Sequence, residues 1–152
     1  MKKTLLLGLY VSLTSSFILN TGFKREEPVS LTWKILSDVD FNKKWNKSEG
    51  MFILKPIFGS SVAALKDKMV KITGYMIPID LSSDYYVLSS NPYASCFFCG
   101  GAGPESVMSI KFKDKPKRFN TDDRVTLIGR LHLNKDNLDE LNYILQEAVF
   151  IE

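Results

Sequence analysis

The chain has 152 residues, of which 45% are hydrophobic and 24% are charged. This is the length of one domain and the composition of a globular protein, which excludes a disordered or fibrous chain. Two cysteines and one histidine exclude a disulfide-dense scaffold, and also a metal site built from several histidines of one chain. The formal net charge is +3.

The N-terminus has the pattern of a secretory signal. Lys2 and Lys3 precede the uncharged run Thr4–Leu19, which is shorter than the ~20 apolar residues of a transmembrane helix. We therefore expect residues 1–22 to be a signal peptide and the rest of the chain to be periplasmic or extracellular, without a stable membrane span if the signal is cleaved. An uncleaved anchor is the alternative. Without the two lysines, 18 basic residues face 17 acidic ones, a balance that disfavours binding to nucleic acid.

The remaining chain is predicted to be one domain with mostly strands. Residues 23–30 are polar and are expected to form a tether, so that the domain covers residues 31–152. Residues 31–37 fit either a strand or one helical turn, and a short helix is predicted from Ser60 or Ser61 toward Leu65. Alternating apolar residues predict strands at Met69–Ile79, Tyr85–Ser89, Val107–Lys113, Arg124–Leu133 and Tyr143–Ile151. A second short helix is expected over Asp136–Leu141.

Two of these strands carry a central glycine. Gly74 and Gly129 predict bulges or sharp bends, which let one strand serve both halves of a barrel. Pro78 should end its strand or place it at an edge, because proline has no amide proton to donate. We therefore predict a mainly β, OB-like barrel of five strands with one or two short helices, and a small β-sandwich as the alternative.

The segment from residue 91 to 105, NPYASCFFCGGAGPE, holds both cysteines. Cys96 and Cys99 form a Cys-x-x-Cys pair, which is compatible with three chemistries. A disulfide would close a very small loop and stabilise the fold little. A thiol–disulfide exchange site needs a thiol of lowered pKa, usually at the start of a helix, whereas glycines follow here. A metal site would take two thiolates from this pair, and Glu105 is a possible extra ligand.

The segments 64–79 and 89–105 resemble a bacterial family of exported proteins, domain of unknown function 3299 (DUF3299). Its members carry the motif Leu-Asp-Gly-Lys-x-Val-x-x-x-Gly-Tyr-x-x-Pro, which matches here from Leu65 to Pro78, with Asp67 one place late and the motif's first glycine missing. Many members then have Cys-x-His before a proline run, whereas this chain has Cys96 and Cys99. If the two pairs share a role, metal binding explains both, because histidine cannot form a disulfide.

These observations predict a non-enzymatic binding module that handles a thiophilic metal, zinc-like, through Cys96 and Cys99. Its partner would be the metal ion or an unknown envelope protein, in a role accessory to envelope transport or metal homeostasis. A thiol–disulfide oxidoreductase and a structural interaction domain with an inert disulfide are the alternatives. His132 is expected to lie exposed on a strand, and the basic stretch from Lys111 to Arg118 is expected to be a solvated turn.

Overall fold

A computed structural model of the protein describes residues 26–152. The predicted signal peptide and residues 23–25 of the predicted tether lie outside this range. None of the helices in residues 26–152 is long and apolar enough to cross a membrane.

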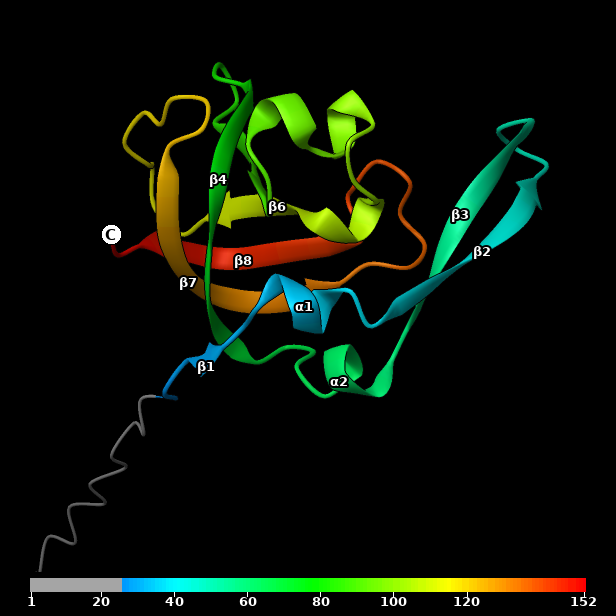
Figure 1. Ribbon diagram of the computed structural model, residues 1–152, viewed down its shortest axis with the longest axis horizontal. Coiled ribbons are helices and arrows are strands. Elements are labelled where there is room, and N and C mark those ends of the chain that lie inside the picture. The colour runs from blue at the N-terminus through cyan, green and yellow to red at the C-terminus, as the bar shows by residue number, and fades with distance from the viewer. Residues whose placement is uncertain (1–25) are drawn as a thin grey trace, which may run out of the picture.

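Five strands close into a barrel, and a sixth short strand lies beside them (Figure 1). The six are β1 (Val29–Ser30), β4 (Met69–Asp80), β5 (Tyr85–Ser89), β6 (Val107–Phe112), β7 (Arg124–Leu133) and β8 (Tyr143–Phe150). Their order is β1-β4-β5-β6-β8-β7, and a further pairing of β4 with β7 closes the ring. Within the ring only β6 and β8 are parallel. The predicted OB-like barrel is therefore confirmed, and the sandwich alternative is wrong.

Strand β4 bends at Gly74 and pairs with a different neighbour on each side of the bend. Its first part, up to Tyr75, pairs with β7, and from Tyr75 onward it pairs with β5. A Cβ atom on Gly74 would lie 2.6 Å from the carbonyl oxygen of Ser89, so the close approach of the two strands requires glycine. The prediction that a glycine lets one strand serve both halves of the barrel is confirmed here.

The second central glycine lies at a similar close approach. Gly129 sits where the register between β7 and β8 shifts, and a Cβ atom there would lie 2.7 Å from the carbonyl oxygen of Gln146. Pro78 does not end β4: the strand changes register after it and continues to Asp80. Beyond Tyr75, β5 is its one strand neighbour among the described residues, so Pro78 lies on an edge, which was the other predicted outcome. The predicted bulge at Gly129 is confirmed, and β4 is one residue longer than predicted.

Two one-turn helices cover the N-terminal side of the barrel. The ambiguous segment 31–37 forms the helix α1 (Trp33–Leu36), whose Trp33 indole nitrogen donates a hydrogen bond of 2.8 Å to the carbonyl of Thr73 in β4. The helix α2 (Ser60–Ala63) lies where a helix was predicted. Before α1, Val29 and Ser30 form β1, which pairs with β4. The last two residues of the predicted tether are therefore part of the six-stranded sheet.

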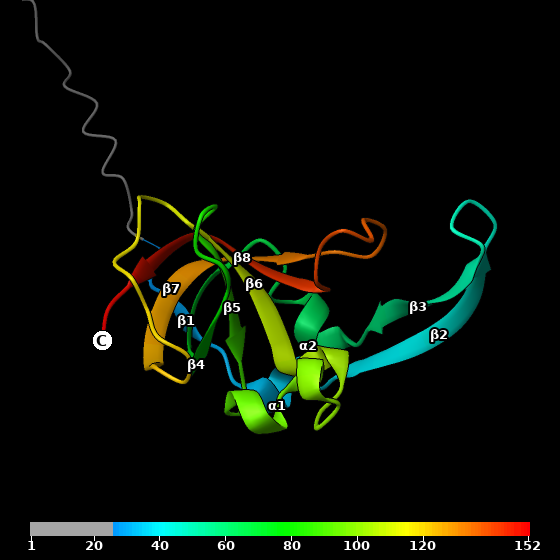
Figure 2. The same ribbon diagram turned by 90° about the horizontal axis from the view of Figure 1, so that it is seen from above.

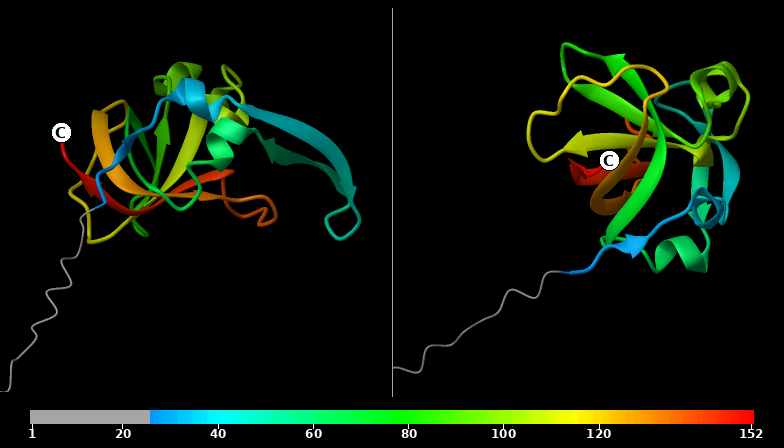
Figure 3. Two further views of the ribbon diagram at one scale, coloured as in Figure 1. Left: turned by 90° about the horizontal axis from the view of Figure 1, so that it is seen from below. Right: turned by 60° about the vertical axis from the view of Figure 1, so that its left-hand side comes forward.

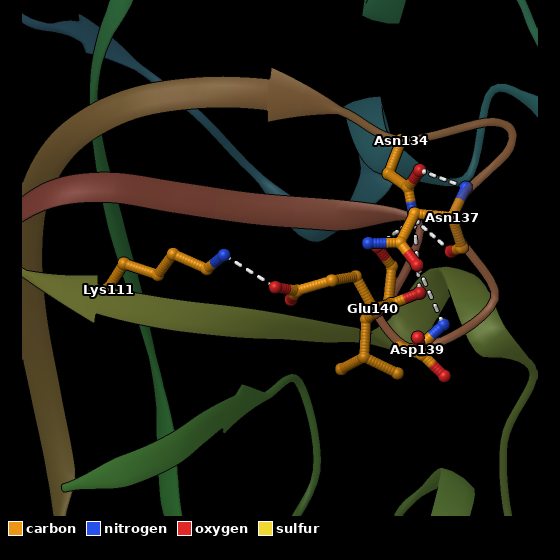
Figure 4. Close-up of polar contacts among 6 residues, drawn as sticks. Lys111, Asn134, Asn137, Asp139 and Glu140 are labelled. Carbon is orange, nitrogen blue, oxygen red and sulfur yellow. Dashed lines mark hydrogen bonds and ion pairs between the residues drawn. The ribbon is translucent and has the colours of Figure 1, made fainter. Parts of the chain in front are cut away.

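The predicted helix over Asp136–Leu141 is wrong, because the side chain of Asn134 takes the backbone groups that a helix would pair. Its amide nitrogen donates to the carbonyl oxygens of Asn137, Glu140 and Leu141, at 2.7, 3.1 and 3.3 Å. Its amide oxygen accepts from the backbone nitrogens of Asp136 and Asn137. The loop between β7 and β8 is therefore wrapped around one asparagine (Figure 4).

A long β-hairpin that was not predicted projects from the barrel. It consists of β2 (Val39–Asn46) and β3 (Met51–Phe58), which form a two-stranded sheet of their own. Figure 2 shows this β2–β3 hairpin extending well beyond the barrel.

The core of the barrel is apolar and has two parts. The larger cluster fills the barrel interior with side chains from β4 to β8 and from α1 and α2. A smaller cluster is made by Ile77, Val87, Cys96 and Val107, with Phe97 and Leu141 packed against it. One of the two cysteines is therefore part of the hydrophobic core.

Candidate functional site

The cysteine segment connects β5 to β6 and consists of short 3-10 turns (Figure 1). The turns are η1 (Tyr93–Ser95), η2 (Phe97–Cys99) and η3 (Pro104–Ser106). The two ends of the segment are joined, because the Ser90 nitrogen donates a hydrogen bond of 2.9 Å to the Ser106 carbonyl. The segment is also fixed to the loop before β7, since the Tyr93 nitrogen donates to the Asp122 carboxylate at 2.7 Å. The barrel thus holds the cysteine loop at both ends.

The two cysteines differ in solvent exposure. Cys96 is fully buried in the smaller core cluster, and Cys99 is exposed. The Cys96 carbonyl accepts hydrogen bonds from the backbone nitrogens of Cys99 and Gly101, at 3.2 and 3.1 Å. This turn carries the chain from the buried cysteine to the exposed one within three residues.

The two glycines after Cys99 have a structural role in this turn. Gly100 has a φ angle of +75°, a left-handed conformation that favours glycine. Gly101 lies against the preceding turn, because a Cβ atom there would be 2.6 Å from the Ser95 carbonyl oxygen. The Gly-Gly pair therefore closes the loop around the cysteines, and the chain does not continue into an α-helix there.

Cys96 and Cys99 are neighbouring free thiols. The pKa of Cys99 is raised above its ordinary value, first by desolvation, then by the charge of Cys96 and by a hydrogen bond with Cys96. The neighbouring Cys96 thiol therefore makes ionisation of Cys99 harder. A cation bound between them would reverse this effect, because it stabilises both thiolates.

Glu105 is not gathered with the two thiols. Its carboxylate folds over Gly103, and its charge contributes to raising the pKa of Tyr143. In residues 26–152, no group of three or more His, Cys, Asp or Glu side chains is arranged to hold a metal. The described chain therefore offers two sulfur ligands at this site, and Glu105 lies apart from them.

The other residues weighed from the sequence lie elsewhere on the barrel. His132 is partly exposed on β7, with its Nδ1 atom 3.8 Å from an Asp67 carboxylate oxygen. In the basic stretch, Lys111 forms an ion pair with Glu140 (Figure 4), and the Lys117 ammonium lies 3.8 Å from the centre of the Phe150 ring. These lysines contact groups of the same chain, as expected for a turn at the surface.

The exposed aromatic residues of the β2–β3 hairpin were not predicted from the sequence. Trp45 and Phe52 face each other across the two strands, with ring centres 5.0 Å apart. The available signal was the uncharged apolar run at the start of β3, which follows a lysine-rich strand and a polar turn. A second exposed feature therefore exists besides the cysteine loop.

Comparison with known proteins supports the fold. No protein family model matches the chain, and no curated protein matches it either. A crystal structure of a DUF3299 family protein from Pseudomonas aeruginosa is similar, with a TM-score of 0.52 and 15% sequence identity. The similarity covers 83% of this chain and 97% of that one.

The structural neighbour is thus a member of the family that residues 65–78 resemble. The chain has the fold of a DUF3299 protein. This likeness shows the fold alone, and any role of Cys96 and Cys99 must be argued from the geometry of the loop itself.

Proposed function

We propose that the protein is an exported, non-enzymatic binding module that holds a thiophilic metal ion, zinc or a similarly soft ion, through Cys96 and Cys99. The observation that carries this proposal is a pair of free thiols on one 3-10 turn, one of them exposed. Thiolates are the protein ligands that soft metal ions prefer.

In this proposal the exposed and the buried cysteine have different roles. The exposed Cys99 is the group that an arriving ion meets first, and the buried Cys96 holds the second sulfur in place through its packing with Val87 and Val107. Binding requires both thiols to lose their protons, so it releases protons and strengthens as the pH rises. The raised pKa of Cys99 extends this pH dependence to higher pH, because the free thiol stays protonated there.

Two sulfur ligands form half of a tetrahedral zinc shell. Water or groups of a partner protein would supply the rest. Such a half-open site suits a protein that passes a metal on rather than one that stores it. This geometry and the predicted export together support a role as an accessory to envelope transport or metal homeostasis.

The oxidoreductase alternative fits the loop less well. An exchange catalyst needs a thiol whose pKa is lowered, whereas that of Cys99 is raised. Its motif usually opens a helix, whereas Gly100 and Gly101 turn the chain back here. An inert disulfide would leave neither sulfur available to a metal.

The test is a joint measurement of bound metal and free thiols on the protein purified from the cell envelope, followed by zinc titration at several pH values. We expect close to one metal per chain or per pair of chains, and an affinity that rises with pH. Cys99→Ser should lose the metal without loss of fold, because Cys99 is exposed. His132→Gln is the control, since it removes the chain's one histidine at a distant position and should leave binding unchanged.

Three outcomes would contradict the proposal. Metal retained in Cys99→Ser would place the site elsewhere. Oxidised sulfurs without metal, resistant to mild reductant, would indicate an inert disulfide. A metal-free pair with a reduction potential in the range of exchange catalysts, between about −120 and −270 mV, would indicate an oxidoreductase.

A further inference from the structure

Both outer edges of the β2–β3 hairpin lack a strand neighbour within residues 26–152. Figure 3 shows the two strands leaving the barrel side by side and ending in a free turn. Within residues 26–152, β3 has β2 as its one strand neighbour. The other edge of β3 therefore presents backbone amide and carbonyl groups with no strand to pair with.

Strand β3 has the composition of a strand from the interior of a sheet. Its first four residues, Met51 to Leu54, are all apolar. The strand therefore lacks the alternation of apolar and polar residues that is typical of a half-exposed strand, and both of its faces are apolar there. Continuous apolar runs belong to strands that are covered on both faces. The hairpin alone cannot provide that cover.

Five large apolar side chains of the hairpin are more than half exposed. They are Trp45, Met51, Phe52, Leu54 and Ile57, with exposed fractions of 55% or 56%. Aromatic side chains of this kind bury ~150–250 Å² when fully covered, so the five present on the order of 500 Å² per chain. By register and alternation, Trp45, Phe52 and Leu54 lie on one face of the hairpin and Met51 and Ile57 on the other, so a strand added at the edge of β3 would cover part of this surface on each face.

The charges of the hairpin distinguish its two edges. Strand β2 carries Lys43 and Lys44, and lysines are the residues that natural edge strands use against pairing. The first charge of β3 is Lys55, which forms an ion pair with Asp136 at 2.7 Å. The outer edge of β3 therefore has nothing that repels another strand between Met51 and Leu54.

We infer that a second copy of this chain pairs along the outer edge of β3. Two identical strands related by a two-fold axis across their edge run antiparallel, so the two hairpins form one four-stranded sheet. Lys43 and Lys44 of both copies then lie on the outer strands, separated by the two central ones. Pro56 cannot donate a hydrogen bond, which limits the new ladder to residues 51–55.

A strand fits this edge better than a lipid surface does. An acyl layer could cover Phe52 and Met51, but it offers no hydrogen-bond partners to the free backbone groups of β3. A copy of β3 pairs these backbone groups, and its own apolar side chains lie beside Phe52 and Leu54 on the faces of the joined sheet.

The experiment is sedimentation velocity of the full chain as purified, over a range of micromolar concentrations, with the mass per chain taken from mass spectrometry. We expect twice the mass of one chain. Leu54→Glu should reduce this to one, because it places a charge on the pairing edge. It should leave the hairpin intact, because Lys43 faces residue 54 across the strands and an opposite-charge pair is favourable there.

Asn42→Glu is the matched control. It also adds one negative charge opposite a lysine, here Lys55, but on the outer strand, so the doubled mass should persist. A single-chain mass for the unchanged protein would overturn the inference, as would a doubled mass that survives Leu54→Glu. Flotation of the protein with phosphatidylglycerol vesicles, abolished by Leu54→Glu in a protein that stays single, would show that a lipid surface occupies the edge instead.

Discussion

At the scale of single residues, Tyr143 links the barrel to the helix in front of it. Its hydroxyl donates a hydrogen bond of 2.6 Å to the carbonyl of Leu36, the last residue of α1, and its ring packs against Phe58. The pKa of Tyr143 is raised strongly above its ordinary value, mainly by burial and further by the charges of Glu105 and Asp38. The folded structure therefore favours the neutral hydroxyl of Tyr143, which donates this hydrogen bond.

We expect Tyr143→Phe to lower the free energy of unfolding by ~1–3 kcal/mol, because the buried Leu36 carbonyl loses its donor while the ring is kept. The difference should depend on pH. Since the folded-state pKa is above the unfolded-state value of about 10, the stabilisation is complete below pH 10 and is lost as the pH rises further. Urea unfolding at pH 8 and pH 11 should show the advantage of the unchanged protein shrinking by ~1.4 kcal/mol at the higher pH. A constant difference would mean that the hydroxyl is not protected in the folded state.

The cysteine pair shows how far residue types alone predict a site. The Cys-x-x-Cys spacing correctly indicated that Cys96 and Cys99 are close, because any tight turn brings such residues together. It could not indicate that Cys96 is buried and Cys99 exposed, since this depends on how the loop packs on β4, β5 and β6. The direction of the Glu105 side chain could not be predicted from the sequence either, because it depends on the turn at Gly103, over which the carboxylate lies.

At the scale of elements, alternation predicted the barrel strands well. The bounds of β5 and β7 were predicted to the residue. In the second half of β7 buried residues alternate with half-buried ones, whereas β5 is short and apolar and is buried on both faces. The hairpin was missed because β3 is apolar on both faces and β2 is mostly polar, so neither strand has period two. The two strands pair with each other outside the barrel. Their residues therefore need not alternate between apolar and polar, as they do where one face of a strand covers a core.

The loop between β7 and β8 was mispredicted for a different reason, and it leads to a prediction of its own. Asn134 forms hydrogen bonds through both ends of its amide group, and Asn137 in turn accepts from the Asp139 nitrogen (Figure 4). Asn134→Ala should therefore lower the free energy of unfolding by ~2–4 kcal/mol, because several backbone groups lose partners at once. The midpoint of urea unfolding measures this change.

Asn134→Asp makes the comparison more specific. Aspartate keeps an acceptor for the nitrogens of Asp136 and Asn137 but has no donor for the three carbonyls. It should be destabilised nearly as much as Asn134→Ala. Full stability of the aspartate variant would show that the carbonyl contacts contribute little.

At the scale of the whole molecule, the protein has two parts that differ in strand pairing and core packing. The barrel has a closed ring of strands and a continuous core. The β2–β3 hairpin joins it at one end and has neither. Composition and periodicity predicted the first part, but they could not predict the second, since its apolar residues serve a surface rather than the interior.

This division predicts the pattern of amide hydrogen exchange. A two-stranded ribbon is at best marginally stable in water, so in the single-chain Leu54→Glu variant the amides of residues 42–54 should exchange on the order of 100-fold faster than those of β7 and β8. In the unchanged protein at concentrations where two copies pair, β3 should gain more protection than β2, because only its outer edge acquires a new neighbour. Mass spectrometry of exchanged peptides resolves the two strands, since they are separated by the turn at residues 47–50. Equal protection of hairpin and barrel in the variant would show that the hairpin belongs to the cooperative unit of the barrel.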